Sequence, residues 1–227
     1  MDILVILDRS GSMQDAKSDH EGGLRSFVED QRGLDGDVRF TLVQFDTQNP
    51  CEIVYDRTPI ADVKDVLLIP RGGTPLLDAV GRAVSHLRAE LPPNENVVVL
   101  VITDGEENDS HEWTKDRVKS LVAELEGKGW SFLFLGANVD AFAEAAAIGI
   151  SATTSLGFSN AGGAGTVGAA YAATSSNILH SRRAMAAGMS RAQAASFMSY
   201  TAQQRGAATG SAALTTGTVD EKDEQEA

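Results

Sequence analysis

The chain has 227 residues, of which 42% are hydrophobic, so it can bury one substantial core with an appendage. Its formal net charge of -13 argues against nucleic-acid backbones and anionic membrane surfaces as partners. A single cysteine, Cys51, excludes an internal disulfide framework and is typical of a protein in a reducing cytosol.

The N-terminal stretch lacks the features of a targeting segment. Met1 is followed at once by Asp2 and an aliphatic run, without a charged n-region or a small-residue cleavage site. No apolar run approaches the length that spans a bilayer. We therefore expect no signal peptide, no membrane partner and a cytoplasmic location.

The chain opens on five aliphatic residues, 3–7, that end at Asp8. Such a run is typical of a strand buried on both faces inside a parallel sheet. Ser10 and Ser12 follow at alternate positions, with Gly11 between them. A carboxylate and two hydroxyls on a tight loop offer three hard oxygens, which suits Mg²⁺. Taken alone, this D-x-S-x-S pattern is a weak signal, because any polar strand-to-helix turn could carry it.

Predicted strands and helices alternate along the chain. The predicted strands cover residues 3–7, 38–45, 51–56, 97–103, 130–135 and 151–156. The predicted helices cover residues 15–31, 76–91, 109–126 and 139–148, and residues 61–68 form a brief helical or irregular crossing. The alternation predicts a parallel sheet with helices on both faces, and the polar positions of strand 51–56 place it at an edge.

Two later stretches supply further oxygens. The buried strand 97–103 ends in Asp104, and a glycine-opened turn at 71–75 carries Thr74. Thr74 and Pro75 also match an N-cap and a first helical residue for the helix that follows.

With these three stretches the chain resembles the von Willebrand factor A (vWA) family and its metal-ion-dependent adhesion site (MIDAS). That site combines D-x-S-x-S, a distant Thr and a distant Asp, and all five positions are present: Asp8, Ser10, Ser12, Thr74 and Asp104. The resemblance covers about residues 1–156. It is strongest to the small stand-alone vWA proteins of bacteria and their phages, some of them linked to tellurium-resistance loci or to MoxR-type AAA+ ATPases.

The resemblance implies an α/β fold with three layers. The expected sheet is doubly wound, six-stranded and mostly parallel, with the order 3-2-1-4-5-6 and one antiparallel edge strand. In that order the strands that end at Asp8 and Asp104 are neighbours, at the reversal point where such sheets bind ligands.

The resemblance also implies a function that is not enzymatic. Ser10, Ser12 and Thr74 would ligate Mg²⁺ or Mn²⁺, with Ca²⁺ less expected. Asp8 and Asp104 would act directly or through bound water. A partner protein would complete the coordination with an Asp or Glu side chain, and a MoxR-type ATPase or a tellurium-resistance-type protein is a candidate partner.

The composition shifts to Gly, Ala, Ser and Thr after the vWA-like part, residues 1–156. Residues 157–206 are predicted to form a helical extension, with helices over 164–181 and 190–204. Residues 207–227 are small, polar and finally acidic, and we expect them to be disordered.

Several charged residues near these motifs have plainer interpretations. Glu106, Glu107 and Asp109 are expected to form a solvated loop face. Arg9 and Arg71 are expected to be solvent-exposed. A turn-capping role is at least as plausible for Asp46 as a place at the site, and the four histidines, scattered without ligand spacing, are expected to be structural or surface residues.

Two other classes of function compete. In a haloacid-dehalogenase-like phosphatase Asp8 would be the nucleophile, but that family needs a second Asp where this chain has Ser10. In a bacterial or phage assembly protein the C-terminal helices would oligomerise. The sequence leaves open the partner, the oligomeric state, the metal and any switching of the site.

Overall fold

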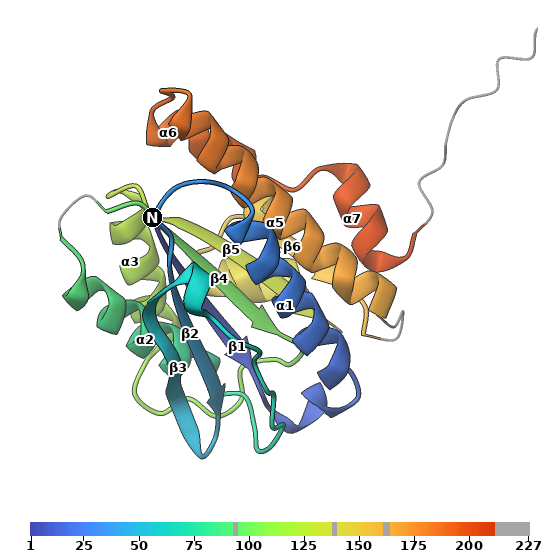
Figure 1. Ribbon diagram of the computed structural model, residues 1–227. Coiled ribbons are helices and arrows are strands. Elements are labelled where there is room, and N and C mark those ends of the chain that lie inside the picture. Colours follow the sequence, from blue (N-terminus) through green and yellow to red (C-terminus); the bar gives the residue numbers. More distant parts are fainter. Residues whose placement is uncertain (93–94, 138–139, 161–163, 212–227) are drawn as a thin grey trace, which may run out of the picture.

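The computed structural model describes residues 1–92, 95–137, 140–160 and 164–211. Its centre is a six-stranded sheet in the order β3-β2-β1-β4-β5-β6 (Figure 1). The strands are β1 (Asp2–Asp8), β2 (Arg39–Asp46), β3 (Asn49–Pro59), β4 (Val97–Thr103), β5 (Ser131–Ala137) and β6 (Ser155–Phe158). Neighbouring strands of this sheet pair in parallel, except that β2 and β3 are antiparallel. The predicted strand order and antiparallel edge are thus confirmed.

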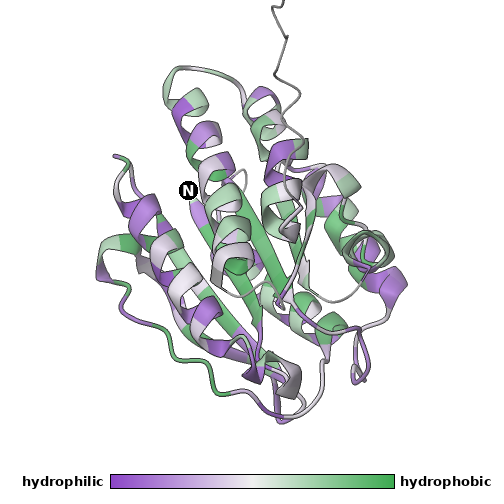
Figure 2. Ribbon diagram, turned by 90° about the vertical axis from the view of Figure 1, so that its right-hand side faces the viewer, coloured by the Kyte–Doolittle hydropathy of each residue, from purple (hydrophilic) through white to green (hydrophobic). Residues whose placement is uncertain are grey.

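Helices cover both faces of the sheet. They are α1 (Lys17–Arg32), α2 (Leu76–Glu90), α3 (Lys115–Glu126), α4 (Ala141–Ala147), α5 (Ala164–Ala186), α6 (Arg191–Ala195) and α7 (Ala202–Thr209), with short 3₁₀ helices at Gly11–Gln14, Ile60–Asp62, Ala152–Thr154 and Ser196–Met198. Figure 2 shows hydrophobic strands between helices that carry both hydrophobic and hydrophilic residues. None of the helices in the described ranges is both long and apolar enough to cross a bilayer.

The first strand shows why its sequence is apolar without interruption. Ile3, Val5 and Leu7 belong to the core under α1 and α5. Leu4 and Ile6 belong to the core under α2, α3 and α4. Because side chains of a strand alternate between two covered faces, every position has to be hydrophobic.

Helix α5 packs along α1 and belongs to the same core. Val167, Tyr171 and Ile178 of α5 are completely or almost completely buried there. The Tyr171 ring lies so close to Gly23 of α1 that a Cβ at that position would be 2.4 Å from a ring carbon. Only glycine fits at position 23, because a side chain there would collide with the Tyr171 ring.

The predicted helix 190–204 is wrong as one continuous element. Ser190 and Gln193 form a capping box at its start, but α6 ends at Ala195. The chain then extends at Tyr200, whose buried side chain bonds through its hydroxyl to Thr174 Oγ1 at 2.8 Å.

A second capping box, at Thr201, starts α7. This helix continues to Thr209, beyond the predicted start of the tail at residue 207. Residues 212–227 of that tail lie outside the described residues, as does Val139, the predicted start of the helix 139–148.

The predicted start of the helix at 109–126 is also wrong. Helix α3 begins at Lys115, with the Thr114 side chain as its N-cap. The reason lies in α2: the Asp78 carboxylate accepts the backbone N–H groups of residues 111–113 at 2.7–2.9 Å. These contacts hold the segment as a loop that wraps the start of α2.

Candidate metal site

Two carboxylates meet at the C-terminal edge of the sheet. Asp8 is the last residue of β1, and Asp104 follows directly after β4. The two strands are parallel neighbours, and Leu7 is paired with Ile102. The sheet therefore brings both acids to the same edge, as predicted.

Hydrogen bonds join four of the five predicted site residues. The Oγ atoms of Ser10 and Ser12 are 3.0 Å apart, and Ser12 Oγ donates to Asp104 Oδ1 at 2.6 Å. The backbone N–H of Ser10 donates to Asp8 Oδ1 at 2.6 Å. The first loop and the loop after β4 thus form one cluster of oxygen atoms.

Thr74 arrives from a third loop. Gly72 O accepts the backbone N–H of Gly11 at 3.0 Å, which ties this loop to the first. The Thr74 hydroxyl lies beside Gly105, where a Cβ would be only 3.0 Å from Thr74 Oγ1. The three loops that carry the five predicted residues therefore meet at this edge of the sheet.

Thr74 does not cap α2, so that prediction is wrong. Pro75 occupies the N-cap position and makes no side-chain cap. The Glu107 carboxylate takes over the role by accepting the backbone N–H of Leu77 at 2.8 Å. Asn108 holds Thr74 in place instead, since its Oδ1 accepts the Thr74 N–H at 2.9 Å.

Both acids of the cluster are surrounded by neutral donors. Asp8 is completely buried, and Thr103 Oγ1 donates to its Oδ2 at 2.6 Å. Burial raises the pKa of Asp8 to about 6, against the hydrogen bonds from Thr103 and Ser10, and the Asp104 charge raises it further. Burial also raises the pKa of Asp104, against the hydrogen bond from Ser12. A cation bound here would offset both desolvated charges.

The cluster opens to the surface at one residue. Ser12 is exposed, whereas Asp8, Ser10, Thr74 and Asp104 are each no more than 5% exposed. A metal held by these oxygens would therefore lie at the surface, within reach of another protein.

The donor set fits a small, hard cation. It contains three hydroxyls and two carboxylates, the ligand type of Mg²⁺ and Mn²⁺. In the described ranges no group of three or more His, Cys, Asp or Glu residues could hold a metal ion. A metal held at this place would therefore need the hydroxyls as ligands.

Some site contacts were not predicted. Asn160, in the loop after β6, donates to Asp104 Oδ2 at 3.2 Å. It lies beyond the predicted vWA boundary and belongs to no motif, so the sequence carried no signal for it. Glu107, expected on a solvated face, instead accepts the N–H groups of Asp109 and Ser110 as well as that of Leu77.

The expected exposure of the two arginines is wrong for Arg9. Arg9 is 4% exposed and is paired with Asp46, and Arg71 reaches the same carboxylate. The turn-capping role of Asp46 is confirmed, because its Oδ1 accepts the N–H groups of Gln48 and Asn49.

A family model, the von Willebrand factor type A domain, matches residues 2–162. The chain belongs to the von Willebrand factor A family. The MIDAS of vWA domains binds a divalent metal, and these domains often mediate metal-dependent protein interactions. A search of the curated proteins found no match.

Several solved structures share the vWA fold. One is proximal thread matrix protein 1 from the mussel byssus with a zinc-occupied MIDAS motif, at 20% identity and a TM-score of 0.51, covering 69% of this chain and 40% of that one. Another is the pilus adhesin SpaC from Lactobacillus rhamnosus GG, at 14% identity and a TM-score of 0.59, covering 79% and 30%. The vWF domain of the type V pili tip protein Mfa5 from Porphyromonas gingivalis is matched at 12% identity and a TM-score of 0.53, covering 78% and 94%. The chain thus spans less than half of the first two proteins, and at these identities the likeness shows the fold.

Proposed function

We propose that this vWA protein binds a partner protein through a divalent metal. The metal would be held by Asp8, Ser10, Ser12, Thr74 and Asp104, and a partner carboxylate would complete its coordination. The observation that carries the proposal is the contact made by Ser12, an exposed residue whose hydroxyl bonds to both Ser10 and Asp104. Ser12 and Asp104 are 92 positions apart in the sequence. Oxygens from remote parts of the chain are thereby arranged around one point at the surface.

The contacts of the cluster suggest a role for each residue. Both oxygens of Asp8 already accept hydrogen bonds, so Asp8 would act on the metal through a bound water. The three hydroxyls would ligate the metal directly and leave it electrophilic. All four carboxylate oxygens of Asp8 and Asp104 already accept hydrogen bonds. The set therefore fits Mg²⁺ or Mn²⁺ better than Ca²⁺, which takes more oxygens and often bidentate carboxylates.

The same contacts favour binding over catalysis. A phospho-accepting aspartate needs a free, accessible oxygen for attack, whereas Asp8 is completely buried with both oxygens occupied. We therefore propose that the protein is not a phosphatase. Assembly through the C-terminal helices is a second possibility, which we rank lower because α5 uses Val167 and Tyr171 in the core of its own chain.

The surface beside the metal loop offers a means of specificity. Leu67 and Ile69 are 71% and 63% exposed, while Leu68 between them is completely buried. This segment leads directly into the loop that carries Thr74. A partner acid flanked by aliphatic side chains would match such a rim, and a MoxR-type ATPase or a tellurium-resistance-type protein in the cytoplasm is the candidate to test first.

Calorimetric titration with Mg²⁺ and with Mn²⁺ tests the metal site. The wild-type chain should give a saturable heat, and Ser12→Ala should remove it. Ser18→Ala, which deletes an exposed hydroxyl on α1, is the matched control and should bind as the wild type does. A wild-type chain that takes up neither metal would contradict the proposal.

Affinity capture tests the role of the metal in partner binding. The tagged chain should retain its partner from a lysate of the native organism in Mg²⁺ and lose it in EDTA. Asp104→Ala should lose the same protein in Mg²⁺. A partner that stays bound in EDTA would place the interface elsewhere.

A further inference from the structure

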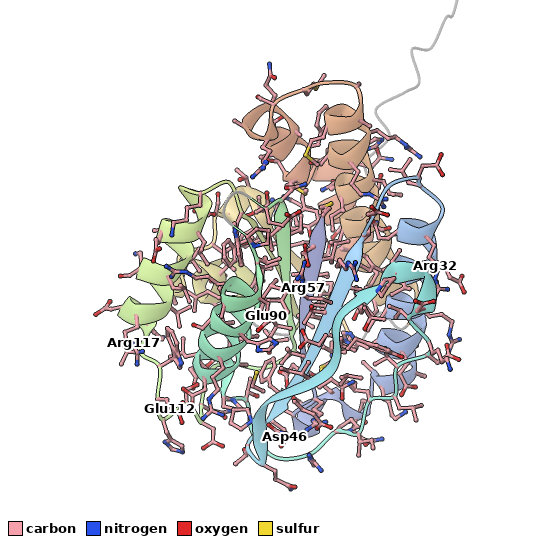
Figure 3. The ribbon with its side chains drawn as sticks, turned by 60° about the vertical axis from the view of Figure 1, so that its left-hand side comes forward. Arg32, Asp46, Arg57, Glu90, Glu112 and Arg117 are labelled. Carbon is pink, nitrogen blue, oxygen red and sulfur yellow. The ribbon has the colours of Figure 1, made fainter. Side chains whose placement is uncertain are left out.

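A compact group of charged residues lies beside the metal site but outside its motif. Asp46 ends β2 and is completely buried next to the β2–β3 hairpin (Figure 3). Its Oδ2 accepts Arg9 Nε at 2.5 Å and Arg71 Nε at 2.9 Å. Glu52 of β3 forms a further ion pair with Arg9. Two positive and two negative side chains therefore balance one another.

The two arginines belong to different loops of the metal site. Arg9 stands between Asp8 and Ser10, and Arg71 stands three residues before Thr74. The backbones of the same loops also meet, since the N–H of Arg71 donates to Arg9 O at 2.8 Å. One carboxylate thus holds together the loop that carries three site residues and the loop that carries a fourth.

Asp46 has no capacity left to ligate a metal. Its Oδ1 accepts the N–H groups of Gln48 at 2.6 Å and Asn49 at 3.0 Å, and its Oδ2 accepts the two guanidinium groups. Any effect of Asp46 on metal binding must therefore pass through the loops that it fixes.

We propose that Asp46 is a positioning residue, which through Arg9 and Arg71 pre-assembles the metal site before the metal binds. The inference rests on the proposed metal-binding function. Its physical basis is loop entropy: without the shared carboxylate, the two loops would have to be ordered when the metal binds, and the affinity would fall. Residues that orient metal ligands commonly change metal affinity by about 10–100-fold when they are replaced.

The test compares metal affinities by calorimetric titration with Mn²⁺ and Mg²⁺. Asp46→Asn should weaken binding by about tenfold or more. Asp2→Asn is the matched control, because Asp2 is also buried and ion-paired, with Arg57 at 2.9 Å, but lies at the opposite end of β1. It should destabilise the fold and leave the metal affinity unchanged. An unchanged affinity in Asp46→Asn, or an equal loss in Asp2→Asn, would overturn the inference.

A second pair of variants covers the case in which Asp46→Asn folds poorly. Arg71 is 39% exposed and can be replaced without burying a bare charge. Arg71→Gln should bind metal more weakly than the wild type, and Arg71→Lys should recover part of the loss. Equal affinities in all three proteins would also contradict the inference. If the wild type itself binds no metal, the proposed function fails first, and the two failures are thereby distinguished.

Discussion

Asp8 and Asp46 end neighbouring parallel strands, and both carboxylates are completely buried. Their surroundings differ in charge. For Asp46, burial would raise the pKa, but hydrogen bonds from Arg71, the Asn49 N–H and Arg9 outweigh it and lower the pKa. For Asp8, burial prevails over neutral donors and raises the pKa to about 6. The comparison teaches that the charge of Asp46 is neutralised by arginines of its own chain, while the charge of Asp8 has only neutral donors around it and, under the proposed function, would be offset by a bound metal.

The largest expected effect concerns the acid that is already neutralised. Asp46→Ala should lower the free energy of unfolding by about 3 kcal/mol or more, because the buried Arg9 loses its main partner. Asp2→Ala should cost only about 1–2 kcal/mol, since water can reach the half-exposed Arg57 once it is freed. Urea unfolding in EDTA measures both. Equal losses would mean that the Asp46 cluster is no more than an ordinary ion pair.

The buried His20 of α1 is expected to make the stability of the fold depend on pH. Burial lowers the pKa of His20 to about 4 from 6.5, against the interactions with Asn160 and Asp19. Because the folded pKa is lowered, neutral His20 contributes stability that is complete above pH 6.5 and is lost as the pH falls towards 4. The full difference is about 3 kcal/mol.

His20→Gln should remove this dependence. Relative to the wild type, its free energy of unfolding in EDTA should rise as the pH is lowered from 7 to 4.5. Asp8 acts in the opposite direction over the same interval, because its raised pKa makes its contribution complete below 3.8 and lost as the pH rises through about 6. Parallel curves for the variant and the wild type would show that His20 titrates normally in the fold.

The fold was predictable because its signals are local. The aliphatic runs before Asp8 and Asp104 are long enough to identify central strands, and the acids follow directly at their ends. Once the strand order is known, parallel pairing alone brings the two acids together. Most of the site could therefore be assigned from short stretches of sequence.

The errors involve contacts between remote residues. Arg9 reads as an exposed loop residue until β2 brings Asp46, 37 positions away, to its guanidinium. In the same way the capping of α2 comes from Glu107, 30 positions away from Leu77. Tyr200 lies between two helices inside a helical pattern, and its hydroxyl bonds to Thr174, 26 positions away. No local pattern encodes these partners.

A smaller effect of opposite sign is expected for Asp8, whose buried charge has only neutral donors around it. Asp8→Asn should raise the free energy of unfolding at pH 8 in EDTA by about 2 kcal/mol. The raised pKa of Asp8 means that its buried charge costs about 3 kcal/mol, which the substitution would recover. The amide that replaces the carboxylate would have only one oxygen to accept from Ser10 and Thr103, and the donor left without an acceptor costs about 1 kcal/mol. A destabilised Asp8→Asn would show that neutral donors alone satisfy this carboxylate, and the contrast with Asp46 would fail.

The smallest effect is that of the metal on stability. At a Mg²⁺ concentration ten times the dissociation constant, binding should stabilise the wild type by about 1.4 kcal/mol. Asp8→Asn should gain nothing, because the added amide cannot orient a metal-bound water as an anion does. Urea unfolding with and without Mg²⁺, at equal ionic strength, separates specific binding from salt screening. A similar gain in both proteins would assign the stabilisation to the general acidity of the chain, with its net charge of -13, and not to the carboxylate at the end of β1.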